Sequence, residues 1–244
     1  MQEKPTLEVC LTPQLYAKRN TIGDEHLAVV IDVLRATSTL SAMASRLTQP
    51  IKIEQNLDKL QALKAQGYKI VSEREGCTTD FADYANDPIL FLDNQVDTDA
   101  HFAFSSTNGG NALYIAAADA REVVLGAFLN WDAVVNYVKN RNLDTVIMCS
   151  GFKGNFSLED TLFAGALCDK IINESDFSLL SDSTVAALTI WQSLQKNYVK
   201  SIQQSEHYHR LQKLGMGESA FQCLFANKIN TVAQFKDGYC SPIK

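Results

Sequence analysis

The sequence predicts an α/β fold in which short strands alternate with helices. Residues 51–54 alternate in polarity as a strand does, residues 57–65 carry leucines at helical spacing, and residues 68–72 form another strand-like run. Parallel strands need a crossover of this kind, so this unit predicts a parallel pair within a sheet. The chain has 244 residues, 46% of them hydrophobic, which is enough for one large α/β domain or two small ones.

Short apolar or alternating runs predict the strands, and apolar residues at helical spacing predict the helices. The expected strands are 6–11, 28–31, 51–54, 68–72, 101–105, 122–126, 144–150 and 231–235. The expected helices are 38–47, 57–65, 111–120, 131–139, 183–194, 206–214 and one that Ser157 opens. Residues 220–225 fit a short strand or a short helix, and residues 73–88 fit an irregular acidic loop.

Individual residues mark several of these boundaries. Pro50 stops the helix 38–47, because proline has no N–H to donate. Asn56 is a favourable N-cap for the next helix, and Gly67 follows its last turn. Residues 231–235 are expected to form the terminal strand.

Charge and cysteine usage exclude several classes of partner. The net charge is −6 and no lysine- or arginine-rich run occurs, so neither nucleic acid nor an acidic membrane surface is an expected partner. The N-terminus is polar and no apolar stretch is long enough to span a membrane, so we expect a cytoplasmic protein. None of the six cysteines belongs to a CxxC pair, which favours buried reduced thiols over disulfides or zinc.

One stretch carries the first functional hypothesis. The apolar run 28–31 leads directly into Asp32, and Arg35 and Thr37 follow before the expected helix. Ligands of α/β proteins bind at the carboxyl ends of strands, and helix N-termini attract anions. The turn therefore offers an acid for a metal, a guanidinium for a phosphate, and backbone donors beside both. The alternative is structural: Asp32 caps the helix and Arg35 pairs with it.

Three more turns share this design. Each follows an apolar strand and carries charged, hydroxyl or glycine residues. The four turns are 32–39, 73–76, 106–110 and 150–160. If the strands are parallel, all four turns lie at the same edge of the sheet. One such turn is common, whereas four that converge indicate a site.

The residue types in these turns favour a metal bound beside an anion. The acids are Asp32, Glu73, Glu159 and Asp160, and such oxygen ligands suit Mg²⁺. The bases are Arg35, Arg74 and Lys153, which suit a phosphate. Histidine and cysteine are absent from the four turns, which argues against zinc. Together these groups fit phosphoryl transfer on a small polyanionic phosphate ester.

Each turn also has a plain structural explanation. Ser157 and Asp160 have the spacing of a capping box. Asn108 and Gly109 form a favoured turn dipeptide, and Lys153 fits a surface lysine. The turns therefore carry weight through their convergence and not singly.

Familiar phosphoryl-transfer motifs are absent. No G-x-x-x-x-G-K-[ST] or G-x-S-x-G motif occurs. Leu34 stands where a haloacid-dehalogenase-type enzyme carries its second aspartate. His207 and His209 stand two apart, which sends them to nearly opposite faces of a helix, so a shared metal is not expected.

The order of the four turns resembles the ComB family, the Mg²⁺-dependent 2-phosphosulfolactate phosphatases. The matching segments are DVLRATST (32–39), EREG (73–76), STNG (106–109), GNFSLED (154–160) and AGA (164–166), with a weaker match around Ser205 and His207. The first and fourth segments are long enough to be specific. The chain departs from the family pattern at residues 85–88, Gly110 and Tyr208, which bears on the substrate more than on the fold.

The resemblance implies one three-layer α/β/α domain over residues 1–244, with a mostly parallel or mixed sheet. It implies hydrolysis of (R)-2-phospho-3-sulfolactate to sulfolactate and phosphate, as in coenzyme M biosynthesis, with Mg²⁺ near the acidic residues. The phosphate, carboxylate and sulfonate of that substrate agree with three cationic side chains at one edge. A homodimeric assembly is left open.

We assign candidate roles to the residues of the four turns. The catalytic candidates are Asp32, Arg35, Glu73 and Asp160. The substrate-binding candidates are Arg35, Thr37, Arg74, Asn108, Gly109, Lys153 and Ser157. The metal-ligand candidates are Asp32, Glu73, Glu159 and Asp160, with Asp32 either a ligand or the nucleophile. Two alternatives stay open: a phosphatase of another small 2-phospho-carboxylic acid, and a non-catalytic protein that binds an anionic metabolite at a decayed site.

Overall fold

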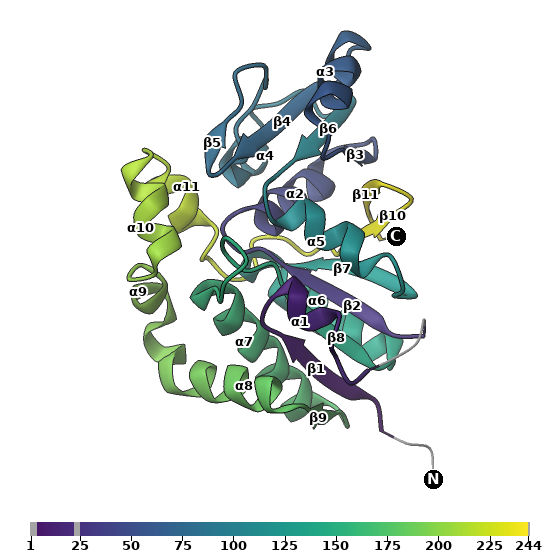
Figure 1. Cartoon of the computed structure of the whole chain (residues 1–244), viewed down its shortest axis with the longest axis vertical. Coiled ribbons are helices and arrows are strands. Elements are labelled where there is room, and N and C mark those ends of the chain that lie inside the picture. The colour runs from purple at the N-terminus through teal and green to yellow at the C-terminus, as the bar shows by residue number, and fades with distance from the viewer. Residues whose placement is uncertain (1–3, 22–24, 244) are drawn as a thin grey trace.

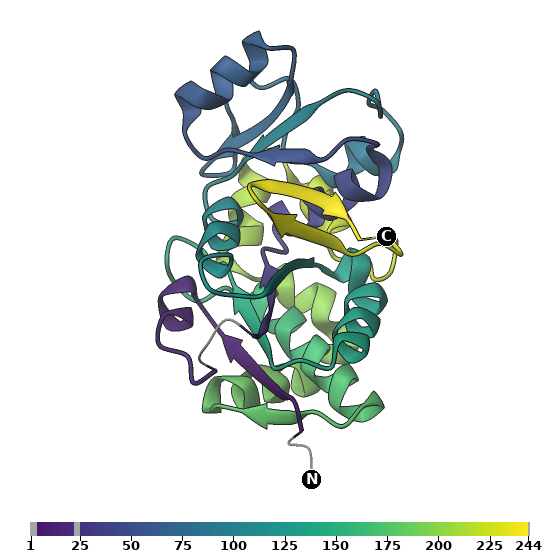
Figure 2. The same ribbon diagram turned by 90° about the vertical axis from the view of Figure 1, so that its right-hand side faces the viewer.

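The computed structural model describes residues 4–21 and 25–243, which form an eleven-stranded mixed sheet flanked by helices (Figures 1 and 2). The strand order is β5-β4-β6-β3-β11-β10-β7-β2-β8-β1-β9. The strands are β1 (Thr6–Cys10), β2 (Leu27–Ile31), β3 (Ile51–Ile53), β4 (Lys69–Arg74), β5 (Cys77–Thr78), β6 (Phe102–Ser105), β7 (Glu122–Gly126), β8 (Thr145–Cys149), β9 (Ser178–Leu180), β10 (Ala233–Lys236) and β11 (Tyr239–Pro242). The predicted α/β/α class with a mostly parallel sheet is confirmed.

Helices cover both faces of the sheet. They are α1 (Pro13–Tyr16), α2 (Ala36–Arg46), α3 (Leu57–Ala65), α4 (Pro88–Leu92), α5 (Gly109–Ala116), α6 (Trp131–Arg141), α7 (Leu158–Glu174), α8 (Asp182–Leu194), α9 (Tyr198–Ile202), α10 (Glu206–Lys213) and α11 (Gly217–Gln222), with 3₁₀ turns at Phe128–Asn130 and Gln195–Asn197. One apolar cluster joins the sheet to α6 through α11, and another joins its opposite face to α1, α2, α4 and α5. Within the described ranges, no helix combines the length and apolar character that a membrane crossing requires.

Strand β2 is buried along its whole length. Successive side chains of a strand point to opposite faces. Ala28 and Val30 accordingly pack in the cluster that contains α2, whereas Val29 and Ile31 pack in the cluster that contains α7. A strand covered on both faces reads as a continuous apolar run. That run therefore locates the carboxyl end of β2, where Asp32 follows.

The strand predicted at 231–235 is present as β10, but the prediction that it is the terminal strand is wrong. The chain passes from β10 through a hairpin into β11, which the sequence reasoning missed. Asp237 and Gly238 have φ values of 51° and 79°, as the two central residues of a type I′ turn require. The Asp-Gly pair was therefore the available signal. The hairpin lies between β7 and β3 and pairs antiparallel with each of them (Figure 2).

This hairpin also corrects the expectation that all four turns lie at one edge of a parallel sheet. Strands β7, β2, β8, β1 and β9 are parallel to one another, as are β3, β6 and β4. Three antiparallel pairings separate the two sets, so their directions are reversed where they join. Sheets twist by about 20–25° per strand on average, so the six steps from β4 to β2 turn the two sets relative to each other. The carboxyl ends of both sets therefore face a common crevice.

Several short elements escaped prediction, namely α1, β5, α4, β9 and α9. Each is too short to show a clear period in the sequence. Helices α1 and α4 nevertheless begin with proline and are capped by Thr12 and Asp87, which are recognisable start signals. Asn56 caps α3 as predicted, by accepting a hydrogen bond from Lys59 N. Most of residues 220–225 belong to helix α11 or the turn after it, so the helical alternative is the correct one.

Candidate active site

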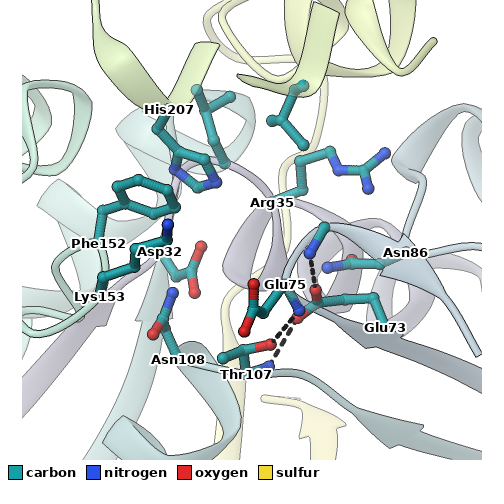
Figure 3. A pocket seen from close by; sticks show the side chains of 13 residues that line it. Asp32, Arg35, Glu73, Glu75, Asn86, Thr107, Asn108, Phe152, Lys153 and His207 are labelled. Carbon is teal, nitrogen blue, oxygen red and sulfur yellow. Dashed lines mark hydrogen bonds between the residues drawn. The ribbon is translucent and has the colours of Figure 1, made fainter. Parts of the chain in front are cut away.

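The four turns meet at one small pocket with a volume of about 40 Å³, drawn in Figure 3. Its lining residues are Asp32, Leu34, Arg35, Glu73, Glu75, Gly76, Asn86, Thr107, Asn108, Phe152, Lys153, His207 and Leu211. The predicted site residues among them are Asp32, Arg35, Glu73, Asn108 and Lys153. The predicted site residues outside this lining are Thr37, Arg74, Gly109, Ser157, Glu159 and Asp160. The convergence of the turns is real, but only part of the predicted set reaches the pocket.

Thr37 holds the backbone of Asp32 at the end of β2. The Thr37 Oγ1 accepts a hydrogen bond from Asp32 N at 3.0 Å. The same hydroxyl lies 2.9 Å from Asp32 O and 2.7 Å from Gly126 O, to one of which it donates. Thr37 is fully buried, so its contacts position Asp32 and link β2 to β7.

The carboxylate of Asp32 faces the pocket with few internal partners (Figure 3). Its Oδ1 accepts one long hydrogen bond, from Ala36 N at 3.3 Å, which is a weak form of the predicted capping role. Burial raises the pKa of Asp32 to about 6, and the negative charge of Glu73 adds to the rise. A cation placed beside this buried carboxylate would stabilise its ionised form.

Gly109 leaves the space that this carboxylate occupies. A Cβ atom at position 109 would lie 2.8 Å from Asp32 Oδ2 and 2.5 Å from the Cβ of Ala36. We expect Gly109→Ala to displace Asp32 and to lower kcat by about tenfold to a hundredfold. Steady-state phosphate release would measure the loss, with Gly217→Ala as the control because a Cβ there meets only ordinary contacts. An unchanged kcat in Gly109→Ala would contradict this role.

Arg35 presents a buried positive charge to the pocket. It is 3% exposed, and its Nη1 donates to Ser219 Oγ of α11 at 3.0 Å. Within the described chain no carboxylate forms an ion pair with it, so the predicted alternative of an Asp32–Arg35 pair does not occur. A buried guanidinium without a counter-charge is unfavourable. The pocket is therefore electrostatically prepared for an anion.

Glu73 joins two of the turns through its carboxylate. The two oxygens accept hydrogen bonds from Gly76 N and Thr107 N, both at 2.6 Å (Figure 3). Carboxylate oxygens keep further lone pairs, so Glu73 retains capacity for a ligand. Arg74 is used differently, because its guanidinium donates to backbone carbonyls and to Ser105 Oγ at 2.8 Å. Arg74 thus braces β4 against β6 behind the pocket.

Asp160 ties two other turns together from behind the pocket. Its Oδ1 accepts from Val33 N at 2.9 Å, and its Oδ2 accepts from Gly151 N at 3.2 Å. Ser157 caps α7 as predicted, with its Oγ accepting from Asp160 N at 3.3 Å. Burial raises the pKa of Asp160 well above its ordinary value, and the charges of neighbouring carboxylates add to the rise. Asp160 and Ser157 therefore organise the backbone that surrounds the pocket.

His207, absent from the predicted site, lines the pocket from α10. Its Nδ1 lies 2.8 Å from Oε1 of the buried Glu159, and its ring stacks on Phe152 with centroids 4.3 Å apart and an interplanar angle of 18°. Burial favours a higher pKa for Glu159, but the hydrogen bond and charge of His207 outweigh it and hold that pKa below its usual value. The weak family match around Ser205 was the available signal, whereas the helix-spacing argument tested only a shared metal with His209.

Asn86 is a second residue that the prediction missed. It is 3% exposed, it lines the pocket, and its Oδ1 has no hydrogen-bond partner in the described chain. An orphaned buried polar atom of this kind points to a partner supplied by a ligand or by water. The sequence reasoning treated residues 85–88 only as loop and as a departure from the family pattern.

The four predicted metal ligands do not form one cluster. Among the residues with described positions, no group of three or more His, Cys, Asp or Glu side chains is close enough to hold a metal ion. Glu159 is bonded to His207, and Asp160 to two backbone N–H groups. Asp32 and Glu73 remain at the pocket wall. Mg²⁺ is commonly held by one or two carboxylates together with water and substrate oxygens, so the donor chemistry of this pair fits it.

Phosphoryl-transfer enzymes use carboxylates that hold a metal and cationic side chains that bind phosphate, and this pocket presents Asp32, Arg35 and Lys153. The fold and the pocket thus define a class of phosphate-processing α/β proteins. Residues 10–238 match the family model described as 2-phosphosulpholactate phosphatase. The chain therefore belongs to this family, the ComB family, whose class is that of phosphoric monoester hydrolases.

Curated relatives carry the corresponding description. A protein of Caldanaerobacter subterraneus subsp. tengcongensis, described as a probable 2-phosphosulfolactate phosphatase, is 31% identical over 92% of this chain and 95% of its own length. A Cyanothece protein with that description is 32% identical over 80% of this chain and 83% of its own. One from Clostridium beijerinckii is 28% identical over 87% and 90%. The resemblance inferred from these sequence segments is confirmed.

Proposed function

We propose that this protein is a Mg²⁺-dependent phosphatase that hydrolyses (R)-2-phospho-3-sulfolactate to 3-sulfolactate and phosphate, the reaction type of coenzyme M biosynthesis. One observation carries the proposal: the weakly bonded carboxylate of Asp32 faces the same pocket as the guanidinium of Arg35, which forms no ion pair with any described residue. Membership of the family and the descriptions of the relatives support the choice of substrate.

The pocket residues divide the work between metal and substrate. Asp32, with Glu73 near it, would hold the Mg²⁺, which when bound neutralises and polarises phosphoryl oxygens. Arg35 and Lys153 bind the anionic groups of the substrate, and Asn108 adds a neutral donor. A substrate with phosphate, carboxylate and sulfonate groups makes use of the metal and both cations together.

One observation favours a second candidate within the same reaction class. Ala85 and Asp87 depart from the family pattern, and Asn86 between them, which agrees with that pattern, places at the pocket a buried amide oxygen that has no hydrogen-bond partner among the described residues. A different acid substituent on a 2-phospho-carboxylic acid would meet this wall. The second candidate is therefore a phosphatase of another small 2-phospho-carboxylic acid, and the third is an anion-binding protein without turnover.

The test is phosphate release by the purified protein. We expect release from (R)-2-phospho-3-sulfolactate that EDTA abolishes and that added Mg²⁺ restores, because the carboxylates need the cation to accept a polyanion. A panel with 2-phospholactate and 2-phosphoglycerate measures kcat/KM under the same conditions. A higher kcat/KM for a panel compound would select the second candidate. Calorimetric binding without release would select the third candidate. The absence of both binding and release would refute the proposal.

We also propose a cytoplasmic location for the enzyme. All six cysteines are free thiols and five of them are buried, as in proteins of reducing compartments. A homodimer stays a prediction that light scattering would test.

A further inference from the structure

We infer that His207 is a catalytic residue of this pocket: its Nε2 gives a proton to the ester oxygen as that oxygen leaves phosphorus. The inference rests on the proposed function, because it assigns the proton donor of that same reaction. Neither the family match nor the relatives' descriptions assign this role.

The ring of His207 is held in place from two sides. Glu159, which is 1% exposed, accepts at Nδ1, and Phe152 stacks along the face of the ring. Both ring contacts leave Nε2 unused, since within the described ranges no residue bonds to it. Figure 3 shows the ring beside Phe152 at the rim of the pocket that Asp32 enters from below. A nitrogen on a fixed ring at the pocket wall is placed to reach a substrate atom.

The chemistry of the ester calls for such a donor. A 2-phospho acid releases a secondary alcohol, and its oxygen is a poor leaving group unless it is protonated. Among the other pocket groups, Arg35 does not give up its proton, and the oxygens of Glu73 already accept two N–H groups. Lys153 is exposed on its loop, with its Nζ 5.4 Å from the centre of the Phe152 ring. His207, in contrast, has a largely buried side chain that is held in one orientation.

The proposed step conserves atoms and charge. The oxygen of a water molecule forms a bond to phosphorus while the bond from phosphorus to the ester oxygen breaks. The electron pair of the broken bond stays on the ester oxygen, which takes the Nε2 proton, and the product departs as an alcohol. The water gives one proton to the solvent and the imidazole regains one from it, so the net reaction consumes one water.

Glu159 acts through His207 as a positioning residue. Its carboxylate accepts a hydrogen bond from Nδ1–H throughout the step. This bond keeps the proton on Nδ1, so Nε2 is the nitrogen that transfers its proton. Glu159 comes from the first turn of α7 and His207 from α10, so the pair exists only in the folded chain.

The test compares two kinds of ester in His207→Gln. One is 2-phospholactate, whose alcohol must be protonated, and the other is whichever of acetyl phosphate, 4-nitrophenyl phosphate and phosphoenolpyruvate the wild type cleaves fastest. These three leaving groups depart with little or no protonation. We expect kcat on 2-phospholactate to fall by about a hundredfold or more, and kcat on the activated ester to stay within about tenfold of wild type. Glu159→Gln is expected to show the same selective loss in milder form.

The matched control is His209→Gln, an exposed histidine on the same helix, which is expected to match the wild type on both esters. Equal losses on both esters in His207→Gln would overturn the inference, because a structural or binding role affects them alike. Full activity on 2-phospholactate would overturn it as well. If the wild type cleaves no ester at all, the proposed function itself fails, and the assignment of His207 fails with it. As a second readout, ¹⁵N NMR of wild type is expected to show a protonated Nδ1, and an unprotonated Nδ1 would contradict the arrangement.

Discussion

Asp32→Asn is expected to slow phosphate release strongly and, at the same time, to make the metal-free protein more stable at neutral pH. Loss of the carboxylate removes the main protein ligand proposed for the cation, and several kcal/mol of charge stabilisation corresponds to about a hundredfold to a thousandfold in kcat. The gain in stability follows from the buried position of Asp32, which is 7% exposed.

The sign of the stability effect comes from the pKa of Asp32. Burial raises the pKa from 3.8 to about 6 in the folded protein, so the native state binds more protons than the unfolded state between these values. Stability contributed by the protonated acid is complete below pH 3.8 and is lost as the pH rises through about 6. Asparagine cannot ionise and escapes this loss. With about 1.4 kcal/mol for each pKa unit, the variant gains about 1 to 3 kcal/mol above pH 6.

Urea unfolding in EDTA at pH 4 and pH 7.5 measures this effect. The difference between variant and wild type should be near zero at the lower pH and favour the variant at the higher one. Asp93→Asn is the control. Asp93 is exposed, so this variant and the wild type should unfold at the same urea concentration at both pH values. If Asp32→Asn releases phosphate like the wild type, or is less stable than the wild type at pH 7.5, Asp32 does not have the proposed central role in the site.

Arg35→Met is expected to lose anion binding while the protein stays folded. Arg35 is buried, and its described side-chain contact is the Ser219 hydroxyl, so a bound anion is the counter-charge that the fold itself does not supply. A charge-assisted hydrogen bond contributes about 1.5–3 kcal/mol, which corresponds to a KM about 10- to 100-fold higher. Methionine fills a similar volume without the charge, so the ligand-free variant should be at least as stable as the wild type.

Two measurements check this result. The KM for the best substrate should rise, and the thermal stabilisation by inorganic phosphate should shrink, because binding to the native state raises stability. Arg46→Met serves as the control, since Arg46 is exposed at the other end of α2. Unchanged phosphate stabilisation in Arg35→Met would show that the buried guanidinium is structural.

The site residues were predictable where they lie at or near the end of a strand that the sequence reveals. Asp32 follows the buried strand β2 directly, Arg35 comes three residues later, and Glu73 lies near the end of β4; such strands are readable as apolar runs. His207 and Asn86 lack that signal, because one lies on an amphipathic helix and the other in an irregular segment before α4. For such residues, entry into the pocket depends on how α10 and the α4 loop pack against the sheet.

The sequence by itself determined the α/β class, the strand that delivers Asp32, the caps at Asn56 and Ser157, and the order of motifs that defines the family. These features depend on local periodicity, and a buried strand or a capped helix shows that periodicity in consecutive residues. The tertiary structure alone decided which acids face the pocket and how the reversed halves of the sheet still meet. The physical reason is that those outcomes depend on contacts between distant segments. Asp160 accepts from Val33 N and Glu159 pairs with His207, whereas Arg35 donates to Ser219 and forms no ion pair among the described residues.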